Sequence, residues 1–337
     1  MKRIFTLHTM AIAALTALAM LASCTSRDSH RKAVAVSLPP QASLLREITG
    51  DSIDIITLMA SDANPESFEV TIKNMRGIAD ADLYMKVGNL AFEETLTDRI
   101  SQANNSLKFT DISQGITPIY GTHSHSAGSP AHNHDAAHSH PAGHNHSTAP
   151  DHDSSTPPSD LSDSSDLSDS SSHHDHENLA VDPHTWTSIT NLKIMAANML
   201  DAINDIDPAN KAYYDANYQL LIHRLDSIDT AISSRLSSSS SKAFLIWHPS
   251  LSYFARDYNL NQIPLGQDNK EMTPGQMRDT HERAAKEDVK VMFIQQNFDA
   301  NQAQTIADEL GVTVVQINPL DADYLRQFNI IANALAQ

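Results

Sequence analysis

The architecture is best predicted from residues 207–236, which read D-P-A-N-K-A-Y-Y-D-A-N-Y-Q-L-L-I-H-R-L-D-S-I-D-T-A-I-S-S-R-L. Proline in the first helical position favours a helix start. Apolar side chains then recur at helical spacing, at Tyr214, Tyr218, Leu221, Leu225, Ile228 and Ile232. A helix of this length measures roughly 45 Å, which is too long for the middle of an average domain. Because it also lies near the midpoint of the folded material, we expect it to link two lobes.

Strands alternate with helices on both sides of this helix. Before it, the pattern predicts strands at 33–38, 53–59 and 83–87 and helices at 41–49, 71–81 and 188–203. After it, the pattern predicts strands at 243–247, 261–263, 289–294 and 312–317 and helices at 251–258, 273–287, 301–310 and 324–336. Such alternation is typical of parallel sheets. The predicted fold class is α/β, with two small α/β lobes and parallel sheets joined by one long helix.

The alternation stops between residues 121 and 178. This segment holds 12 of the chain's 18 histidines, nine acidic residues and no lysine or arginine. Because it contains almost no side chain that a core would bury, we expect a disordered insert rich in His, Asp and Ser. The predicted organisation is an N-terminal lobe at 33–206 that contains this insert, a linking helix at 207–237 and a C-terminal lobe at 238–337.

The first 24 residues are typical of a secretory signal. Lys2 and Arg3 precede an apolar run, and the sequence Leu-Ala-Ser-Cys at 21–24 resembles the cleavage box of bacterial lipoproteins, in which the cysteine carries the lipid. We therefore expect lipidation at Cys24, a polar tether at 25–32 and an extracytoplasmic, membrane-anchored protein in the periplasm or at the cell surface. No later stretch reaches about 18 consecutive apolar residues, so the sequence predicts a lipid anchor without a spanning helix.

Composition excludes several classes of function. The formal charge of −18 argues against nucleic acid as a partner. A single cysteine in 337 residues rules out a disulfide framework and cysteine-rich metal modules. The sequence has no H-E-x-x-H or comparable pairing of a metal site with a general base, so we predict that the protein is not an enzyme.

Three segments place metal-ligand side chains next to predicted strands or at the edge of the insert. They contain Glu66 in D-A-N-P-E-S-F-E (62–69), His184 in V-D-P-H-T-W (181–186) and His248 in W-H-P-S-L-S-Y-F (247–254). Taken singly, each has an ordinary explanation as a turn residue or a solvated loop acid. Their joint placement at the ends of elements in both lobes favours one ligand-rich cleft, since clefts between lobes commonly hold ligand sites.

The same segments resemble a known family, the solute-binding proteins of bacterial ABC transporters for zinc and manganese. Members carry D-P-H-x-W, matched at 182–186, and H-x-x-x-x-Y-F-A-x-x-Y, matched at 248–258. They also carry G-x-x-x-E after the third strand, matched with one residue of slack from Gly88 to Glu93. The resemblance runs from Val34 to the end of the chain and implies a metal cleft between the lobes.

Carried onto this chain, the resemblance implies that His184 and His248 bind the metal. In this family the ligand of the first lobe is usually a histidine, and this chain departs from the pattern with Glu66 at that position. A carboxylate is nevertheless a sound ligand for both zinc and manganese. For the fourth ligand we favour Asp321, with Gln295 or water as alternatives and Asp323 as a less favoured neighbour. The expected cargo is Zn²⁺, with Mn²⁺ as the alternative.

The predicted function is capture of this metal and its delivery to the permease of an ABC importer by a monomeric, membrane-anchored binding protein. The His-rich insert is expected to act as an auxiliary zinc collector through four His-x-His pairs, since imidazole suits zinc far better than manganese. These pairs are His123 with His125, His132 with His134, His138 with His140, and His144 with His146. The alternative function is that of a metal-dependent adhesin with the same fold, because some members of the family are described in that way.

Overall fold

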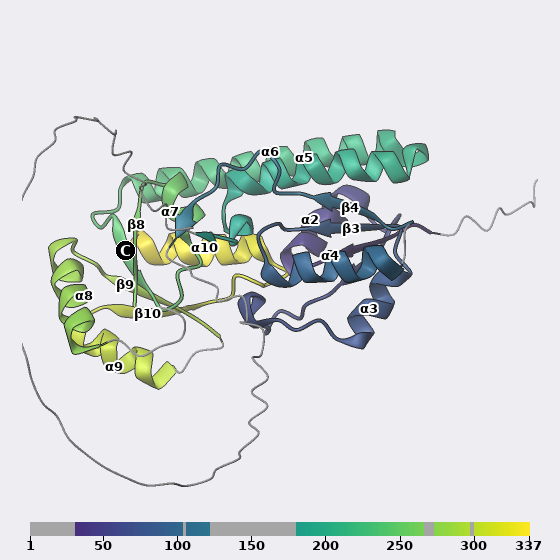
Figure 1. Cartoon of the computed structure of the whole chain (residues 1–337). Coiled ribbons are helices and arrows are strands. Elements are labelled where there is room, and N and C mark those ends of the chain that lie inside the picture. Colours follow the sequence, from purple (N-terminus) through teal and green to yellow (C-terminus); the bar gives the residue numbers. More distant parts are fainter. Residues whose placement is uncertain (1–30, 104–105, 122–179, 266–272, 297–299) are drawn as a thin grey trace, which may run out of the picture. The chain divides into compact units, whose positions relative to one another are not determined.

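The computed structural model describes residues 31–103, 106–121, 180–265, 273–296 and 300–337. Within these ranges the chain forms two four-stranded sheets and a two-stranded pair, with helices packed around the larger sheets (Figure 1). All strand pairs of the two larger sheets are parallel. The predicted fold class, α/β with parallel sheets and one long helix, is confirmed.

The first sheet has the strand order β2-β1-β3-β4. Val34, Ala35 and Val36, which belong to the inner strand β1, are fully buried. Such burial is expected for a central parallel strand that helices cover on both faces of the sheet. The elements of this half are β1 (Ala33–Val36), α2 (Pro39–Thr49), β2 (Asp54–Thr57), η2 (Pro65–Ser67), α3 (Ile72–Ala79), β3 (Leu83–Lys86), α4 (Ala91–Ala103) and β4 (Lys108–Asp111).

The second sheet has the order β10-β9-β7-β8. Its elements are β7 (Ala243–Ile246), α7 (Ser252–Asp257), β8 (Asn261–Pro264), α8 (Pro274–Lys286), β9 (Val291–Gln295), α9 (Ala300–Leu310), β10 (Thr313–Ile317) and α10 (Tyr324–Leu335). Successive side chains of a strand point to opposite faces. Accordingly, Phe244 and Ile246 of β7 belong to the larger hydrophobic core, whereas Ala243 and Leu245 belong to a smaller core on the other face.

Between the two sheets the chain forms β5 (Tyr120–Gly121), β6 (Ala180–Val181), η3 (Thr185–Thr187), α5 (Ile189–Ile206), η4 (Pro208–Asn210) and α6 (Lys211–Ser237). The predicted long helix is present as α6, but its first turn is the separate 3₁₀ helix η4. Helix α6 contacts α2, α5 and α10, so it packs against helices that belong to both halves of the chain.

The larger hydrophobic core includes residues of both four-stranded sheets. Val34 of β1, Leu225 of α6 and Phe293 of β9 all belong to it, and each is fully buried. Since residues 31–121 and 181–337 belong to one compact unit, the loops at the strand ends are held on a shared scaffold. The predicted domain boundaries at 33–206, 207–237 and 238–337 stay a prediction.

Several sequence predictions concern residues outside the described ranges. These are the signal at 1–24 with Cys24, most of the tether at 25–32, and nearly all of the insert at 121–178. The predicted auxiliary zinc ligands of the insert all lie outside the described residues, so their role stays a prediction. They are His123, His125, His132, His134, His138, His140, His144 and His146.

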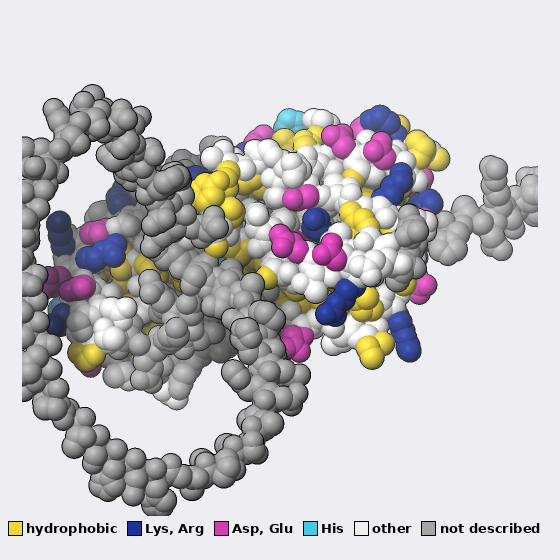
Figure 2. Space-filling view, in the orientation of Figure 1, with side chains coloured by type: hydrophobic (Ala, Val, Ile, Leu, Met, Phe, Trp, Pro, Cys, Tyr) yellow, Lys and Arg dark blue, Asp and Glu magenta, His cyan; other side chains and the backbone are white. Residues whose placement is uncertain are grey.

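Within the part of the chain that the structure describes, no helix is both long enough and apolar enough to cross a membrane. On the face shown in Figure 2, basic and acidic side chains lie interspersed among the described residues.

Candidate metal-binding site

Glu66 lies in the loop that follows β2. The Asn64 side-chain oxygen accepts a hydrogen bond from the Glu66 backbone N–H at 2.9 Å, and Pro65 at the first position favours the 3₁₀ turn η2. Two residues later, the Phe68 ring packs edge-on against Phe92 of α4, with 4.9 Å between ring centroids. The loop is thus capped at its start and held at its end by an apolar contact, and together these fix the backbone that carries the Glu66 carboxylate.

His184 is the residue immediately before η3, and it is only 2% exposed. Its backbone N–H and its ring Nδ1 both lie within hydrogen-bond distance of the Asp182 Oδ1 atom, at 2.9 and 2.8 Å. The hydroxyl of Thr187 donates to the His184 carbonyl at 2.8 Å. These contacts hold the imidazole so that its Nε2 atom faces the cavity.

His248 follows β7 in the second half of the chain. The Gln295 amide nitrogen, at the end of β9, donates to the His248 carbonyl at 2.9 Å and to the Ser250 hydroxyl at 2.7 Å. The Ser250 backbone N–H donates to the same carbonyl at 2.7 Å. The end of one parallel strand thus holds the loop that follows its neighbour, as expected where the carboxyl ends of parallel strands lie side by side.

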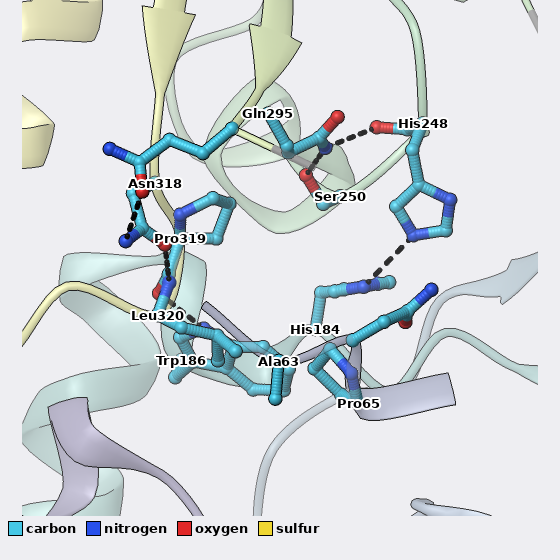
Figure 3. A pocket seen from close by; sticks show the side chains of 12 residues that line it. Ala63, Pro65, His184, Trp186, His248, Ser250, Gln295, Asn318, Pro319 and Leu320 are labelled. Atoms are coloured by element: carbon cyan, nitrogen blue, oxygen red, sulfur yellow. Dashed lines mark hydrogen bonds between the residues drawn. The ribbon is translucent and has the colours of Figure 1, made fainter. Parts of the chain in front are cut away.

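The three side chains converge. His248 Nε2 lies 3.3 Å from His184 Nε2 and 3.3 Å from Glu66 Oε1, and one donor atom from each residue lies within 4.8 Å of the others. Two ligands of a tetrahedral zinc ion with bonds of about 2.1 Å stand about 3.4 Å apart. The geometry therefore allows two imidazoles and one carboxylate to share a single cation. Figure 3 shows the His184 and His248 rings next to each other.

A cavity of about 460 Å³, part of it open to solvent, lies beside these donors. His184 and His248 line it together with neutral side chains, among them Trp186, Gln295, Gln296 and Asn318 (Figure 3). The Trp186 indole N–H donates to the Pro319 carbonyl at 2.9 Å, so segments distant in the sequence close one wall. Among the described residues, no Lys or Arg lines the cavity, so its lining holds no permanent positive charge that would repel a cation.

Burial and the neighbouring carboxylates act on the pKa of His184 in opposite directions. Burial lowers the pKa of His184. The charge and hydrogen bond of Asp182 and the charge of Glu66 raise this pKa, and together they outweigh burial, so the pKa lies above its ordinary value. Burial raises the pKa of Asp182, whereas the charge of His184 and its hydrogen bonds lower it, to about 2. Asp182 is therefore ionised at neutral pH and can only accept hydrogen bonds.

Asp321 is not among these three grouped donors of the described residues, and its role as the fourth ligand stays a prediction. Its carboxylate binds the Arg326 guanidinium and accepts a hydrogen bond from the Gln327 side chain at 2.8 Å. Both partners belong to α10, which begins three residues after Asp321. Asp323, the less favoured neighbour, accepts a hydrogen bond from the Arg326 backbone N–H at 3.1 Å and caps that helix.

Gln295, the alternative to Asp321, lines the cavity. Its amide nitrogen is used by the His248 loop, while its Oε1 atom is buried and has no hydrogen-bond partner among the described residues. A buried carbonyl oxygen without a partner is costly. Gln295 thus stays a candidate fourth donor, either to the cation itself or to a water bound to it.

Glu93, which the sequence placed in G-x-x-x-E, is buried and is not one of the three grouped donors of the described residues. Its carboxylate accepts hydrogen bonds from the backbone N–H groups of Val87 and Gly88, at 2.8 and 2.9 Å, and from the Ser37 hydroxyl. A Cβ on Gly88, whose φ is +85°, would come within 2.4 Å of the Ser113 hydroxyl oxygen. This motif therefore fixes the turn after β3.

Two α/β lobes that bring imidazole and carboxylate donors together at one cavity define a metal-binding protein of the solute-binding class. The chain belongs to the ZnuA family, described as zinc-uptake complex component A, periplasmic, whose model matches residues 34–337. The family predicted from the sequence is thereby confirmed. It is a family of transport components, and it is periplasmic.

Relatives and solved structures agree with this assignment. The high-affinity zinc uptake system protein ZnuA of Bacillus subtilis (strain 168) is 26% identical over 292 residues, which cover 86% of this chain and 78% of that protein. A crystal structure of ZnuA has a TM-score of 0.70 at 24% identity and covers 90% of this chain and 98% of its own.

The laminin-binding protein Lmb of Streptococcus agalactiae, described as bifunctional with adhesin and metal transporting activity, also shares the fold. Its TM-score is 0.67 at 18% identity, over 90% of this chain and 99% of that one. At these identities, the two solved structures are evidence for the fold.

Proposed function

We propose that this protein captures Zn²⁺ at Glu66, His184 and His248 and delivers it to the permease of an ABC importer. The convergence of the three donor atoms within 4.8 Å carries the proposal. The residues come from a loop after β2, a turn before α5 and a loop after β7, so one ion joins three segments far apart in the sequence. In this proposal the protein is a monomeric carrier and catalyses no reaction.

Competition with a chromophoric chelator tests the metal site. We expect the full chain to hold one Zn²⁺ tightly, and the variants E66A, H184A and H248A each to lose that tight binding, because each removes a donor from the cluster. His223 is exposed on α6, so H223A is the matched control and should bind as the parent protein does. Unchanged affinity in all three site variants would rule out this cluster as the binding site.

The donor set also bears on the choice of metal. Two imidazoles favour zinc, whereas the Glu66 carboxylate, a harder oxygen ligand, also admits manganese. For one set of ligands, affinity for Zn²⁺ exceeds that for Mn²⁺ in the general order of divalent metals. We therefore assign Zn²⁺ as the cargo and Mn²⁺ as a weaker competitor, and a titration of one metal against the other on the same protein measures the ratio.

The His-rich insert is proposed to collect zinc weakly and pass it to the cleft. Deleting residues 122–176 should leave the affinity of the tight site nearly unchanged while lowering the total zinc bound per protein. Metal analysis and chelator competition on the deletion variant measure the two quantities separately. Loss of the tight site in the deletion variant would contradict this division of roles.

Lipid attachment at Cys24 is proposed to hold the protein on a membrane outside the cytoplasm. C24S should be released into the soluble extracytoplasmic fraction, whereas the parent protein should stay with membranes and incorporate labelled fatty acid. A C24S variant that still fractionates with membranes would show that another segment provides the anchor.

A second candidate function is adhesion, because Lmb, which is described as an adhesin and metal transporter, shares this fold. Binding of the zinc-loaded and metal-free protein to immobilised laminin tests it. Metal-dependent binding that H248A abolishes favours adhesion, whereas no binding in either state leaves transport alone.

A further inference from the structure

Asp182 is a buried carboxylate that contacts a donor residue without being a donor itself. It is 1% exposed, and it is absent from the group of donor atoms that could share one cation among the described residues. Its Oδ1 atom faces the backbone N–H of His184 at 2.9 Å and the ring Nδ1 of His184 at 2.8 Å. The carboxylate therefore holds His184 by both its main chain and its ring.

This contact determines which ring nitrogen carries the proton. An ionised carboxylate only accepts hydrogen bonds, so a neutral imidazole beside it must carry its proton on Nδ1. The lone pair of His184 is then left on Nε2, the atom that lies 3.3 Å from His248 Nε2. A metal ion binds a nitrogen lone pair, and Asp182 thus leaves the ring in the tautomer that the cluster needs.

Asp182 is itself fixed by both halves of the chain. Its backbone N–H donates to the Ile119 carbonyl at 2.8 Å, and its own carbonyl accepts a hydrogen bond from the Tyr253 hydroxyl at 2.9 Å. The Ile119 N–H donates to the same hydroxyl at 3.3 Å. Tyr253 belongs to α7, five residues after His248, so hydrogen bonds connect the segment after one donor to the residue that orients the other.

We propose that Asp182 is a positioning residue that commits His184 to the Nδ1–H tautomer and aims its Nε2 atom at the cation. This inference rests on the proposed metal site and adds to it a residue that binds no metal. Residues that orient histidine ligands in this way typically change metal affinity by about 10- to 100-fold when they are replaced. We expect a loss in that range for D182A.

The test combines two measurements on the full chain. Histidine ¹⁵N–¹H correlation spectra of the metal-free protein, recorded above the pKa of the ring, report the tautomer of His184, whose signal is assigned by its absence in H184A. Chelator competition reports the zinc affinity. The parent protein should show Nδ1–H, whereas D182A should show a mixture of tautomers or Nε2–H together with weaker binding.

D182N supplies the conservative variant, because its amide oxygen can still accept both hydrogen bonds. It should keep the Nδ1–H tautomer and lose less affinity than D182A, a rescue that a purely structural role does not predict. D257A is the matched control. Asp257 is a largely buried carboxylate nearby that binds Ser188 and Arg256, and its removal should leave both readouts unchanged.

The outcomes separate this inference from the proposed function. If D182A keeps both the Nδ1–H tautomer and the parent affinity, the positioning role is overturned. If the parent protein binds no zinc tightly, the proposed function fails, while the tautomer spectra still decide whether Asp182 orients His184. Should D182A not fold, as judged by its thermal melt, D182E replaces it. Its longer side chain displaces the carboxylate while keeping the charge, and an unchanged tautomer and affinity in D182E would equally overturn the proposal.

Discussion

Glu66 contributes a carboxylate to a cluster whose other two donors are imidazoles. Replacing it by histidine would give three nitrogen donors at the same place. Because nitrogen ligands favour zinc and oxygen ligands admit manganese, E66H should keep tight zinc binding and lose most of the affinity for Mn²⁺. Competition between the two metals on E66H and the parent protein measures the change. An unaltered zinc-to-manganese ratio would show that Glu66 does not bind the ion.

Glu93 gives a prediction about stability. Burial raises its pKa from 4.5 to about 7, against the hydrogen bonds from Ser37, Val87 and Gly88 and the charge of Lys86, which lower it. The folded state therefore binds this proton more tightly than the unfolded state does. Its contribution is complete below about pH 4.5 and is lost as the pH rises through about 7, by up to about 3 kcal/mol.

Denaturant unfolding from pH 4.5 to pH 8 measures this effect against E93Q. The glutamine cannot ionise, but its NH₂ group would face one of the two backbone N–H donors, so E93Q should be less stable by about 1–3 kcal/mol at low pH. The gap should narrow as the pH rises. Parallel pH curves for the two proteins would contradict a raised pKa at Glu93.

Individual residues differ in how far the sequence reveals their place. Glu66, His184 and His248 stand in unusual motifs beside predicted elements. Once two lobes are expected, a cleft between the lobes predicts that these three side chains lie close together. Asp321 could not be judged in the same way, because its partners Arg326 and Gln327 come from the first turns of α10 and only the folded helix brings them to its carboxylate. The hydrogen bonds of Asp182 were missed, although its position two residues before His184 was the available signal.

Among the elements, the long helix α6 shows why burial decides stability. Leu225 is fully buried in the larger core, whereas Leu220, on the same helix, is 69% exposed. Truncating a buried leucine removes apolar contacts and leaves a cavity, which costs about 2–5 kcal/mol. L225A should therefore lower the free energy of unfolding by that amount.

L220A is the control, since an exposed substitution of this kind changes stability by about 0.5 kcal/mol or less. Urea unfolding of both variants provides the comparison. Equal losses in the two variants would mean that α6 does not pack on α2, α5 and α10 in the way described.

The alternation of elements made the fold class predictable, but not every element. Strands with uninterrupted apolar runs, such as β1 and β7, lie within the predicted ranges. In contrast, α4 (Ala91–Ala103) and β4 (Lys108–Asp111) were not predicted. The sequence K-F-T-D of β4 is mostly polar because it lies at the edge of the first sheet, paired only with β3 within the described chain. Edge strands bury less and therefore show a weaker hydrophobic pattern.

In the molecule as a whole, the three donor side chains lie close together although they come from segments that are far apart along the chain. His184 and His248 are 64 residues apart in sequence, yet their Nε2 atoms are 3.3 Å apart. An unfolded chain does not hold them together, so a cation that binds them binds the folded state selectively. Zinc present at about 1,000 times the dissociation constant should then stabilise the fold by about 4 kcal/mol.

Thermal melts with and without zinc test this linkage. The melting temperature of the parent protein and of H223A should rise with zinc and return to its starting value after a chelator is added, whereas H248A should show little or no rise. Because imidazole must be neutral to bind metal, and Asp182 and Glu66 raise the pKa of His184 against its burial, the rise should begin to shrink as the pH falls from above the usual imidazole range. A rise that is equal in H248A and the parent protein would place the stabilising zinc elsewhere, and repeating the melt after deletion of residues 122–176 would then show whether the histidines of the insert account for it.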